Sequence, residues 1–175
     1  MEKTAIIIDS GYINAIYQHY IKIKIDYQKM IDNLSGGKEL LRAYYYFCPP
    51  YQSSPPTAEE KERQSSFNKF LYSLRQIPRL TLRQGKLEKR PDGFKQKRVD
   101  IMMAVDLVTL SARSQIQSAI IIAGDSDLIP AIDTAKNNGT IIYLYYYYKC
   151  VHDELLNACD ERIPMDRALW KKWAH

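Results

Sequence analysis

Short apolar runs alternate with longer amphipathic segments along the chain. Near-continuous apolar runs indicate strands buried on both faces, and they cover residues 4–8, 40–48, 118–123 and 140–148. Residues 79–84 alternate polar and apolar positions, as a strand with one exposed face does. The pattern therefore predicts five strands of unequal burial.

Apolar positions at helical spacing fill the segments between these strands. They predict helices at residues 12–20, 26–34, 57–78, 99–110, 128–137, 152–159 and 165–173. Thr57 and Glu60 have the spacing of a capping box at the start of the third helix. Alternation of strand and helix predicts an α/β fold of Rossmann-like type, with a mainly parallel sheet and helices on both faces. Its 175 residues are expected to form a single domain, 1–175.

Composition narrows the class of protein. Hydrophobic residues make up 46% and charged residues 26%, which is typical of a globular protein. No apolar run approaches the roughly 20 residues that cross a bilayer, and no signal-peptide pattern is present, so we expect a cytoplasmic protein without membrane contact. Cys48, Cys150 and Cys159 are too widely spaced for a zinc site and are expected to be reduced thiols.

Positive charge is concentrated in one segment. The net charge is +5, and residues 78–98 carry eight basic and two acidic side chains. Within this segment, residues 85–97 are expected to form a mobile basic loop or ribbon. Because nucleic acid is held largely through its phosphates, Lys95, Lys97 and Arg98 are candidates to guide an RNA backbone toward the adjacent Asp100. The alternative is a solvated surface loop.

Aspartates follow two of the predicted strands. Asp9 follows the first, and Asp125 and Asp127 follow the strand at residues 118–123. In parallel sheets, ligands bind outside the carboxyl ends of the strands, and repelling carboxylates there favour a hard divalent cation such as Mg²⁺ or Mn²⁺. The alternative for the pair is a strand-to-helix turn in which one aspartate is the N-cap.

Two further aspartates lie in the helix predicted at residues 99–110. Asp100 opens it and could either stabilise the helix dipole or join the acidic pocket. Asp106 lies six positions on, roughly 240° around the helix axis, so the two do not share a face. We expect Asp106 to support the pocket indirectly or to be structural.

Several segments together resemble the NYN domain of the LabA-like branch of the PIN-like nuclease superfamily. They are IIIDSGY, KRVDIMMAVD, IIAGDSDLIPAI with NNGTIIYL, and ELLNACDERI. The resemblance implies a PIN-like fold, ribonuclease or related RNA-processing activity, and a Mg²⁺ or Mn²⁺ site whose metal and catalytic acids are Asp9, Asp100, Asp125 and Asp127. We expect an endoribonuclease. We expect single-stranded RNA as the partner, and a homodimer remains an open alternative. Asp160 matches a closing aspartate of the family and is expected to be structural.

One position departs from the family pattern. Many relatives have Asn three residues after the first Asp, whereas this chain has Tyr12 there and Asn14 two residues later. Either Asn14 replaces that contact from the helix or the contact is missing, and Ser126 is expected to support the neighbouring acids. Tyr12 could instead contact an RNA base. The other tyrosine runs, Tyr44 to Tyr46 and Tyr143 to Tyr148, are expected to pack beneath helices.

Some enzyme classes are excluded by the sequence. Gly11 stands where a haloacid-dehalogenase-type phosphatase needs its second Asp, and neither a G-x-G-x-x-G segment nor a P-loop is present. The three histidines form no metal-ligand pattern. A metal-dependent ribonuclease is the leading hypothesis. The alternatives are a non-catalytic RNA-binding or regulatory protein-interaction module, favoured by Tyr12, and a phosphatase for small phosphate esters.

Overall fold

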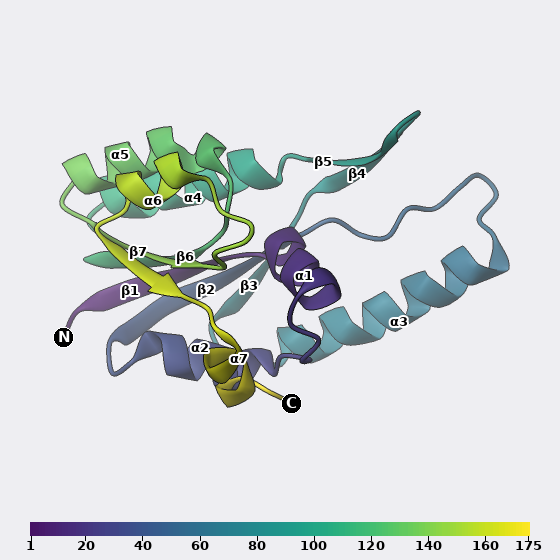
Figure 1. Ribbon diagram of the computed structural model, residues 1–175, viewed down its shortest axis with the longest axis horizontal. Helices are drawn as coiled ribbons and strands as arrows, with labels where there is room; N and C mark the ends of the chain where they lie inside the picture. Colours follow the sequence, from purple (N-terminus) through teal and green to yellow (C-terminus); the bar gives the residue numbers. More distant parts are fainter.

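A six-stranded parallel sheet forms the centre of the protein in the computed structural model, which describes residues 1–175 (Figure 1). The spatial order of its strands is β3-β2-β1-β6-β7-β8, and every neighbouring pair is parallel. The strands are β1 (Lys3–Asp9), β2 (Glu39–Phe47), β3 (Leu80–Gln84), β6 (Ser118–Ile122), β7 (Ile141–Tyr146) and β8 (Glu161–Pro164). The predicted α/β fold with a parallel sheet is confirmed.

Helices cover both faces of this sheet. One layer consists of α4 (Val99–Ala112), α5 (Ile129–Asn137) and α6 (Asp153–Ala158). The other consists of α1 (Ser10–His19), α2 (Tyr27–Ser35), α3 (Ala58–Arg75) and α7 (Arg167–Lys172). A single 3-10 turn, η1 (Ser126–Leu128), precedes α5. The capping box predicted at Thr57 and Glu60 is present at the start of α3.

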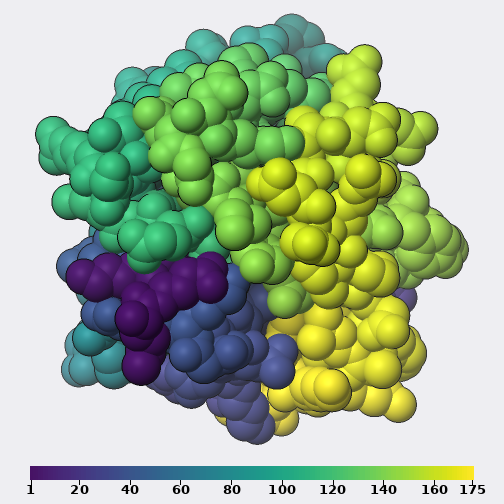
Figure 2. Space-filling view, turned by 90° about the vertical axis from the view of Figure 1, so that its left-hand side faces the viewer, coloured from purple at the N-terminus to yellow at the C-terminus, as the bar shows by residue number.

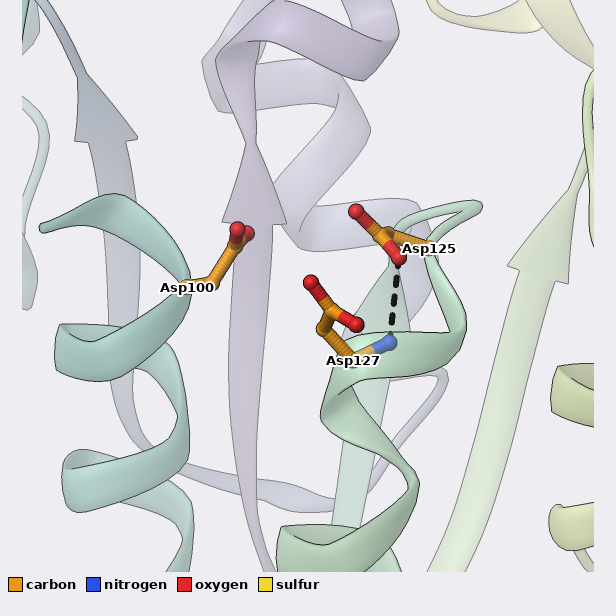
Figure 3. A group of neighbouring side chains, drawn as sticks. All are labelled: Asp100, Asp125 and Asp127. Carbon is orange, nitrogen blue, oxygen red and sulfur yellow. Dashed lines mark hydrogen bonds between the residues drawn. The ribbon is translucent and has the colours of Figure 1, made fainter. Parts of the chain in front are cut away.

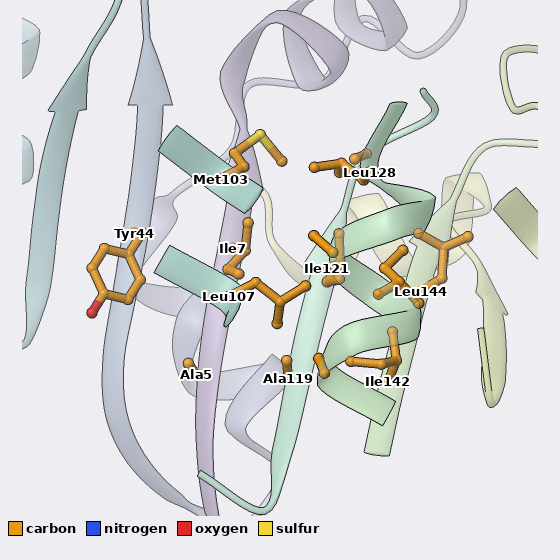
Figure 4. Close-up of a cluster of buried hydrophobic side chains, with 14 of the residues drawn as sticks. Ala5, Ile7, Tyr44, Met103, Leu107, Ala119, Ile121, Leu128, Ile142 and Leu144 are labelled. Carbon is orange, nitrogen blue, oxygen red and sulfur yellow. The ribbon is translucent and has the colours of Figure 1, made fainter. Parts of the chain in front are cut away.

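The central strands bury side chains on both faces, which explains their continuous apolar sequence. In β1, Ala5 and Ile7 face the α4 and α5 layer, whereas Ile6 and Ile8 face the other layer. Figure 4 shows the first cluster, with Leu107 of α4 packed between β1 and β6. Because successive strand residues alternate between faces, apolar residues at every position indicate burial on both sides.

The strands near the carboxyl terminus differ from the sequence prediction in their bounds and number. The strand predicted for residues 140–148 ends at Tyr146, and β8 was not predicted at all. Its sequence, Glu161 to Pro164, is short, charged and mostly exposed, so it carries no apolar signal. It is a strand because its backbone pairs with β7, from Tyr143 opposite Glu161 to Tyr146 opposite Pro164.

The basic segment, predicted as a mobile loop or ribbon, forms a two-stranded β-hairpin. Strands β4 (Lys86–Arg90) and β5 (Gly93–Lys97) pair antiparallel and extend beyond the carboxyl edge of the sheet, away from the helical layers (Figure 1). At the base of the hairpin, a Cβ on Gly85 would lie 2.6 Å from the carbonyl oxygen of Lys97. Because any side chain at residue 85 would clash with this carbonyl group, only glycine permits the first and last residues of the hairpin to approach each other so closely.

The opposite end of the sheet contains the amino ends of the strands. Figure 2 shows this face, with the first residues of the chain at the surface beside the segment that begins β2.

All three cysteines are free thiols, of which Cys159 is buried. None of the helices combines the length and the apolar character that crossing a membrane requires.

Candidate metal centre

The strand order reverses between β1 and β6. The chain passes from β1 to β2 and β3 on one side, then returns to place β6 and β7 on the other side of β1. Such a reversal opens a crevice at the carboxyl ends of the two strands, where ligands bind in parallel sheets. Asp9 ends β1, and Asp125 lies three residues beyond the end of β6, so both stand at this crevice.

Three predicted acids converge there. Asp100, in the first turn of α4, points toward Asp125 and Asp127 of the loop and turn after β6 (Figure 3). One carboxylate oxygen from each lies within 4.8 Å of the others. Asp125 also caps η1, because its Oδ1 accepts a hydrogen bond from the Asp127 backbone N–H at 3.0 Å. Capping and membership of the acidic cluster are therefore compatible.

The composition and spacing of this cluster suit a hard divalent cation. Mg²⁺ holds oxygen ligands at about 2.1 Å in an octahedron, so its ligand oxygens lie about 3 Å or about 4 Å apart. The 4.8 Å within which the three carboxylate oxygens lie is close to the larger of these separations. Partial burial, followed by the charges of Asp125 and Asp127, raises the pKa of Asp100. A bound cation would remove this repulsion.

Asp9 lies beside the cluster rather than within it. Its Oδ1 caps α1 by accepting hydrogen bonds from the backbone N–H groups of Gly11, at 3.0 Å, and Tyr12, at 3.3 Å. Its other oxygen accepts no hydrogen bond from the chain. Burial raises the pKa of Asp9 to about 6, and the nearby charges of Asp100 and Asp125 act in the same direction. The charges of the acidic centre therefore act on Asp9, while one of its carboxylate oxygens caps α1.

This raised pKa predicts a pH-dependent stability of the metal-free protein. Folded Asp9 keeps its proton up to about pH 6, whereas in the unfolded chain the same carboxyl ionises near 3.8. The contribution of Asp9 to the unfolding free energy is therefore fully present below about pH 4 and is lost as the pH rises through about 6. Asp9→Asn keeps a capping oxygen without the charge, so we expect it to stabilise the protein at about pH 7.5 by up to about 3 kcal/mol.

Urea unfolding in chelator at about pH 5 and about pH 7.5 measures this effect. The difference in unfolding free energy between Asp9→Asn and the unsubstituted protein should grow between the two conditions. The matched control is Asp133→Asn, on the exposed side of α5, which should leave the pH dependence unchanged. Parallel pH profiles for Asp9→Asn and the unsubstituted protein would contradict the buried, proton-binding Asp9.

Tyr12 has a structural position in this centre. A Cβ on Gly124 would lie 2.5 Å from the Tyr12 ring, so the ring packs directly against the backbone that leads into Asp125. The Tyr12 hydroxyl accepts a hydrogen bond from the Tyr147 backbone N–H at 2.8 Å. Burial raises its pKa above the ordinary tyrosine value. These contacts occupy both ring and hydroxyl, which disfavours the predicted contact of Tyr12 with an RNA base.

Two residues that the sequence did not single out make contacts beside the acids, His152 at the acidic loop and Gln96 at the start of α1. His152 Nδ1 lies 3.1 Å from the Ser126 hydroxyl, and its backbone N–H donates to the Gly124 carbonyl at 3.2 Å. Ser126 thus links the acidic loop to the segment that begins α6. The Gln96 side-chain amide lies 3.0 Å from the position of a Cβ on Gly11, which brings the hairpin against the start of α1. Neither contact has a signal in the sequence.

Asp106, predicted to support the pocket indirectly or to be structural, and Asn14 lie outside the acidic cluster. Asp106 accepts hydrogen bonds from Arg83 Nε at 2.9 Å, Arg83 Nη2 at 3.1 Å and the Tyr46 hydroxyl at 2.8 Å, and so ties α4 to β2 and β3. Asn14 is exposed and lines a groove of about 520 Å³ with Tyr17 and other residues of α1, α2, α3 and α7, to which no acid of the cluster contributes. Asn14 therefore does not replace the family contact that Tyr12 lacks.

The remaining predicted residues are exposed on and beside the hairpin. Lys97 Nζ forms an ion pair with Glu88 at 2.7 Å, whereas Lys95 makes no ion pair. Arg98 directly precedes α4, the helix of Asp100, in a left-handed conformation with a φ of 75°.

Asp160 lies away from the hairpin. It accepts a hydrogen bond from the Ile142 backbone N–H at 2.8 Å and forms an ion pair with Lys136 at 3.4 Å, so its role is structural.

Fold and site together define an α/β domain with an acidic centre at the carboxyl edge of a parallel sheet. The NYN domain family matches residues 3–166, and the chain belongs to this family. A crystal structure of a protein of unknown function from Vibrio parahaemolyticus has the same fold, with a TM-score of 0.74 at 16% identity over 99% of this chain and 96% of that one. A comparison with curated proteins gives no match.

Proposed function

We propose that this NYN-domain protein is a cytoplasmic, Mg²⁺- or Mn²⁺-dependent endoribonuclease of the LabA-like branch that cleaves single-stranded RNA. The observation that carries the proposal is the convergence of Asp100, Asp125 and Asp127 at the switch point of the sheet. Membership of a nuclease superfamily supports it. The basic hairpin beside the acids supplies positive charge for a phosphate backbone.

The three carboxylates would hold the cation, and Asp9 lies next to them with one oxygen free of hydrogen bonds. A bound divalent ion supplies Lewis-acid polarisation of the phosphodiester and lowers the pKa of a coordinated water. The chain itself contributes a rigid position for each acid. Asp125 is fixed by the η1 cap, and the loop around it by His152 and Tyr12. Such prior positioning is a large part of catalysis.

The test compares a linear and a circular single-stranded RNA of the same sequence, incubated with purified protein and Mn²⁺. Cleavage of both substrates is expected, because an endonuclease needs no RNA end, and chelator should abolish it. Cleavage of the linear RNA alone would contradict internal cleavage. Product that persists in chelator would mark a contaminant and overturn the assignment.

The second candidate is an RNA-binding module without turnover, favoured by Tyr12 at the position where relatives carry Asn. It predicts salt-sensitive binding of the same RNAs with no product in any divalent metal. Rapid cleavage of circular RNA would exclude it. A chromogenic phosphate ester, added to the same preparation, tests for small-molecule phosphatase activity.

A further inference from the structure

The two faces of the β4–β5 hairpin differ in chemistry. The register pairs Leu87 with Gln96 and Lys89 with Phe94, which places these four side chains on one face. The other face carries Lys86, Glu88, Arg90, Lys95 and Lys97. On that face Glu88 is neutralised by Lys97 at 2.7 Å and Arg90 at 3.5 Å. The hairpin with Arg98, residues 86–98, holds six basic and two acidic side chains, a surplus of four positive charges.

An aromatic pair lies on the first of these faces. The Phe94 ring packs against Tyr51 of the β2–α3 loop with centroids 5.3 Å apart and an angle of 47° between the rings. Lys89 Nζ lies 5.4 Å from the centre of the Tyr51 ring. Phe94 is nevertheless 57% exposed, so packing against Tyr51 leaves most of it in solvent. An exposed aromatic ring with a cation beside it is typical of sites that stack unpaired bases.

The same face leads to the acidic centre. Gln96 lies against Gly11, next to the Asp9 cap, and Phe94 comes two residues before it in β5, nearer the tip of the hairpin. Two strand residues span about 7 Å, and a stacked nucleic-acid strand rises about 3.4 Å per nucleotide. The aromatic pair therefore stands about two nucleotides from the point where the hairpin contacts the start of α1.

We infer that Tyr51 and Phe94 form a stacking platform for an unpaired base of single-stranded nucleic acid, with Lys89 contacting its backbone. The inference rests on the proposed function, since the platform would give the proposed ribonuclease site its selectivity for single strands. A duplex keeps its bases stacked on each other and cannot use the platform. The platform thus selects single strands, while the basic face of the hairpin attracts any polyanion.

Binding in chelator tests the platform without turnover. Fluorescence anisotropy with a labelled, unstructured RNA of about 12 nucleotides is compared with the corresponding duplex. Phe94→Ala is expected to weaken single-strand binding by about 5- to 100-fold and to leave duplex binding unchanged. Phe94→Leu, which keeps apolar area without a flat ring, should behave like Phe94→Ala, whereas Phe94→Trp should restore binding. Lys89→Gln should lower the salt dependence of binding.

The matched control is Tyr72→Ala, which removes another exposed aromatic ring, 66% accessible, on α3. It should bind both RNAs as the unsubstituted protein does. Wild-type affinity in Phe94→Ala, or an equal loss for single strand and duplex, would overturn the platform. So would absence of RNA binding combined with Phe94-dependent self-association, which would make the ring a protein contact. The binding experiment contains chelator and requires no cleavage. Its result therefore does not depend on whether the protein is a ribonuclease.

Discussion

Asp125→Asn is expected to lower the rate of Mn²⁺-dependent RNA cleavage by about 10²- to 10⁴-fold. Asparagine keeps the shape of the side chain and an oxygen that can accept the hydrogen bond from the Asp127 N–H, now 3.0 Å long. What is lost is one of the three negative charges that converge within 4.8 Å. The turn should therefore remain while the affinity for a divalent cation falls.

Initial cleavage rates measured across a Mn²⁺ titration check this prediction, and higher metal concentrations should recover part of the activity. Asp133→Asn, the same change at an exposed site on α5, should retain the full rate. Asp125→Asn should also be at least as stable as the unsubstituted protein in chelator, because like charges near Asp100 are reduced. An undiminished rate in a folded Asp125→Asn protein would remove this carboxylate from the mechanism.

Gly124→Ala is expected to cost about 3 kcal/mol of unfolding free energy, which corresponds to a fall in Tm of about 6–12 °C for a chain of this size. The added Cβ would lie 2.5 Å from the Cys150 carbonyl oxygen and 2.5 Å from Tyr12 Cε2. One of these contacts is backbone, so no side-chain rotation relieves it. The displaced loop would carry Asp125 with it, and cleavage should fall together with stability.

Thermal unfolding and cleavage rates of Gly124→Ala are best compared with Gly11→Ala in the same site. A Cβ on Gly11 meets the Gln96 amide at 3.0 Å, the far end of a flexible side chain, and Asp9 Oδ1 at 3.3 Å. Gly11 also lies within α1, where alanine favours the helix by up to about 1 kcal/mol. Gly11→Ala should thus be nearly neutral. Equal stability of the two variants would show that the loop after β6 can shift freely.

The sequence predicted the parts of the fold whose signal is local. The central strands were readable because residues buried on both faces leave an uninterrupted apolar run, as from Ala5 to Ile8. Helix starts were readable where a capping side chain is close in sequence, as at Thr57. Strand β8 was not, because its four residues become a strand only through backbone pairing with β7.

The candidate site divides in the same way. Asp125 and Asp127 follow a buried strand, and this placed them at the carboxyl edge of the sheet from sequence alone. For Asp100 the sequence left helix stabilisation and pocket membership open, and the crossing of α4 over the sheet brings it to the pair. Only the structure assigns Asp9 to the α1 cap, Tyr12 to packing against Gly124, and Asn14 to a groove that no acid of the cluster lines.

By itself, then, the sequence determined a parallel α/β fold with aspartates at the carboxyl ends of its strands, because burial pattern and strand ends are properties of contiguous residues. The tertiary structure decided which of these acids meet, because that depends on how helices and strands distant in sequence pack together. It also decided that the basic segment is a hairpin whose Gln96 contacts Gly11 and whose Phe94 packs on Tyr51. Contacts between residues so far apart along the chain leave no local pattern from which they could be read.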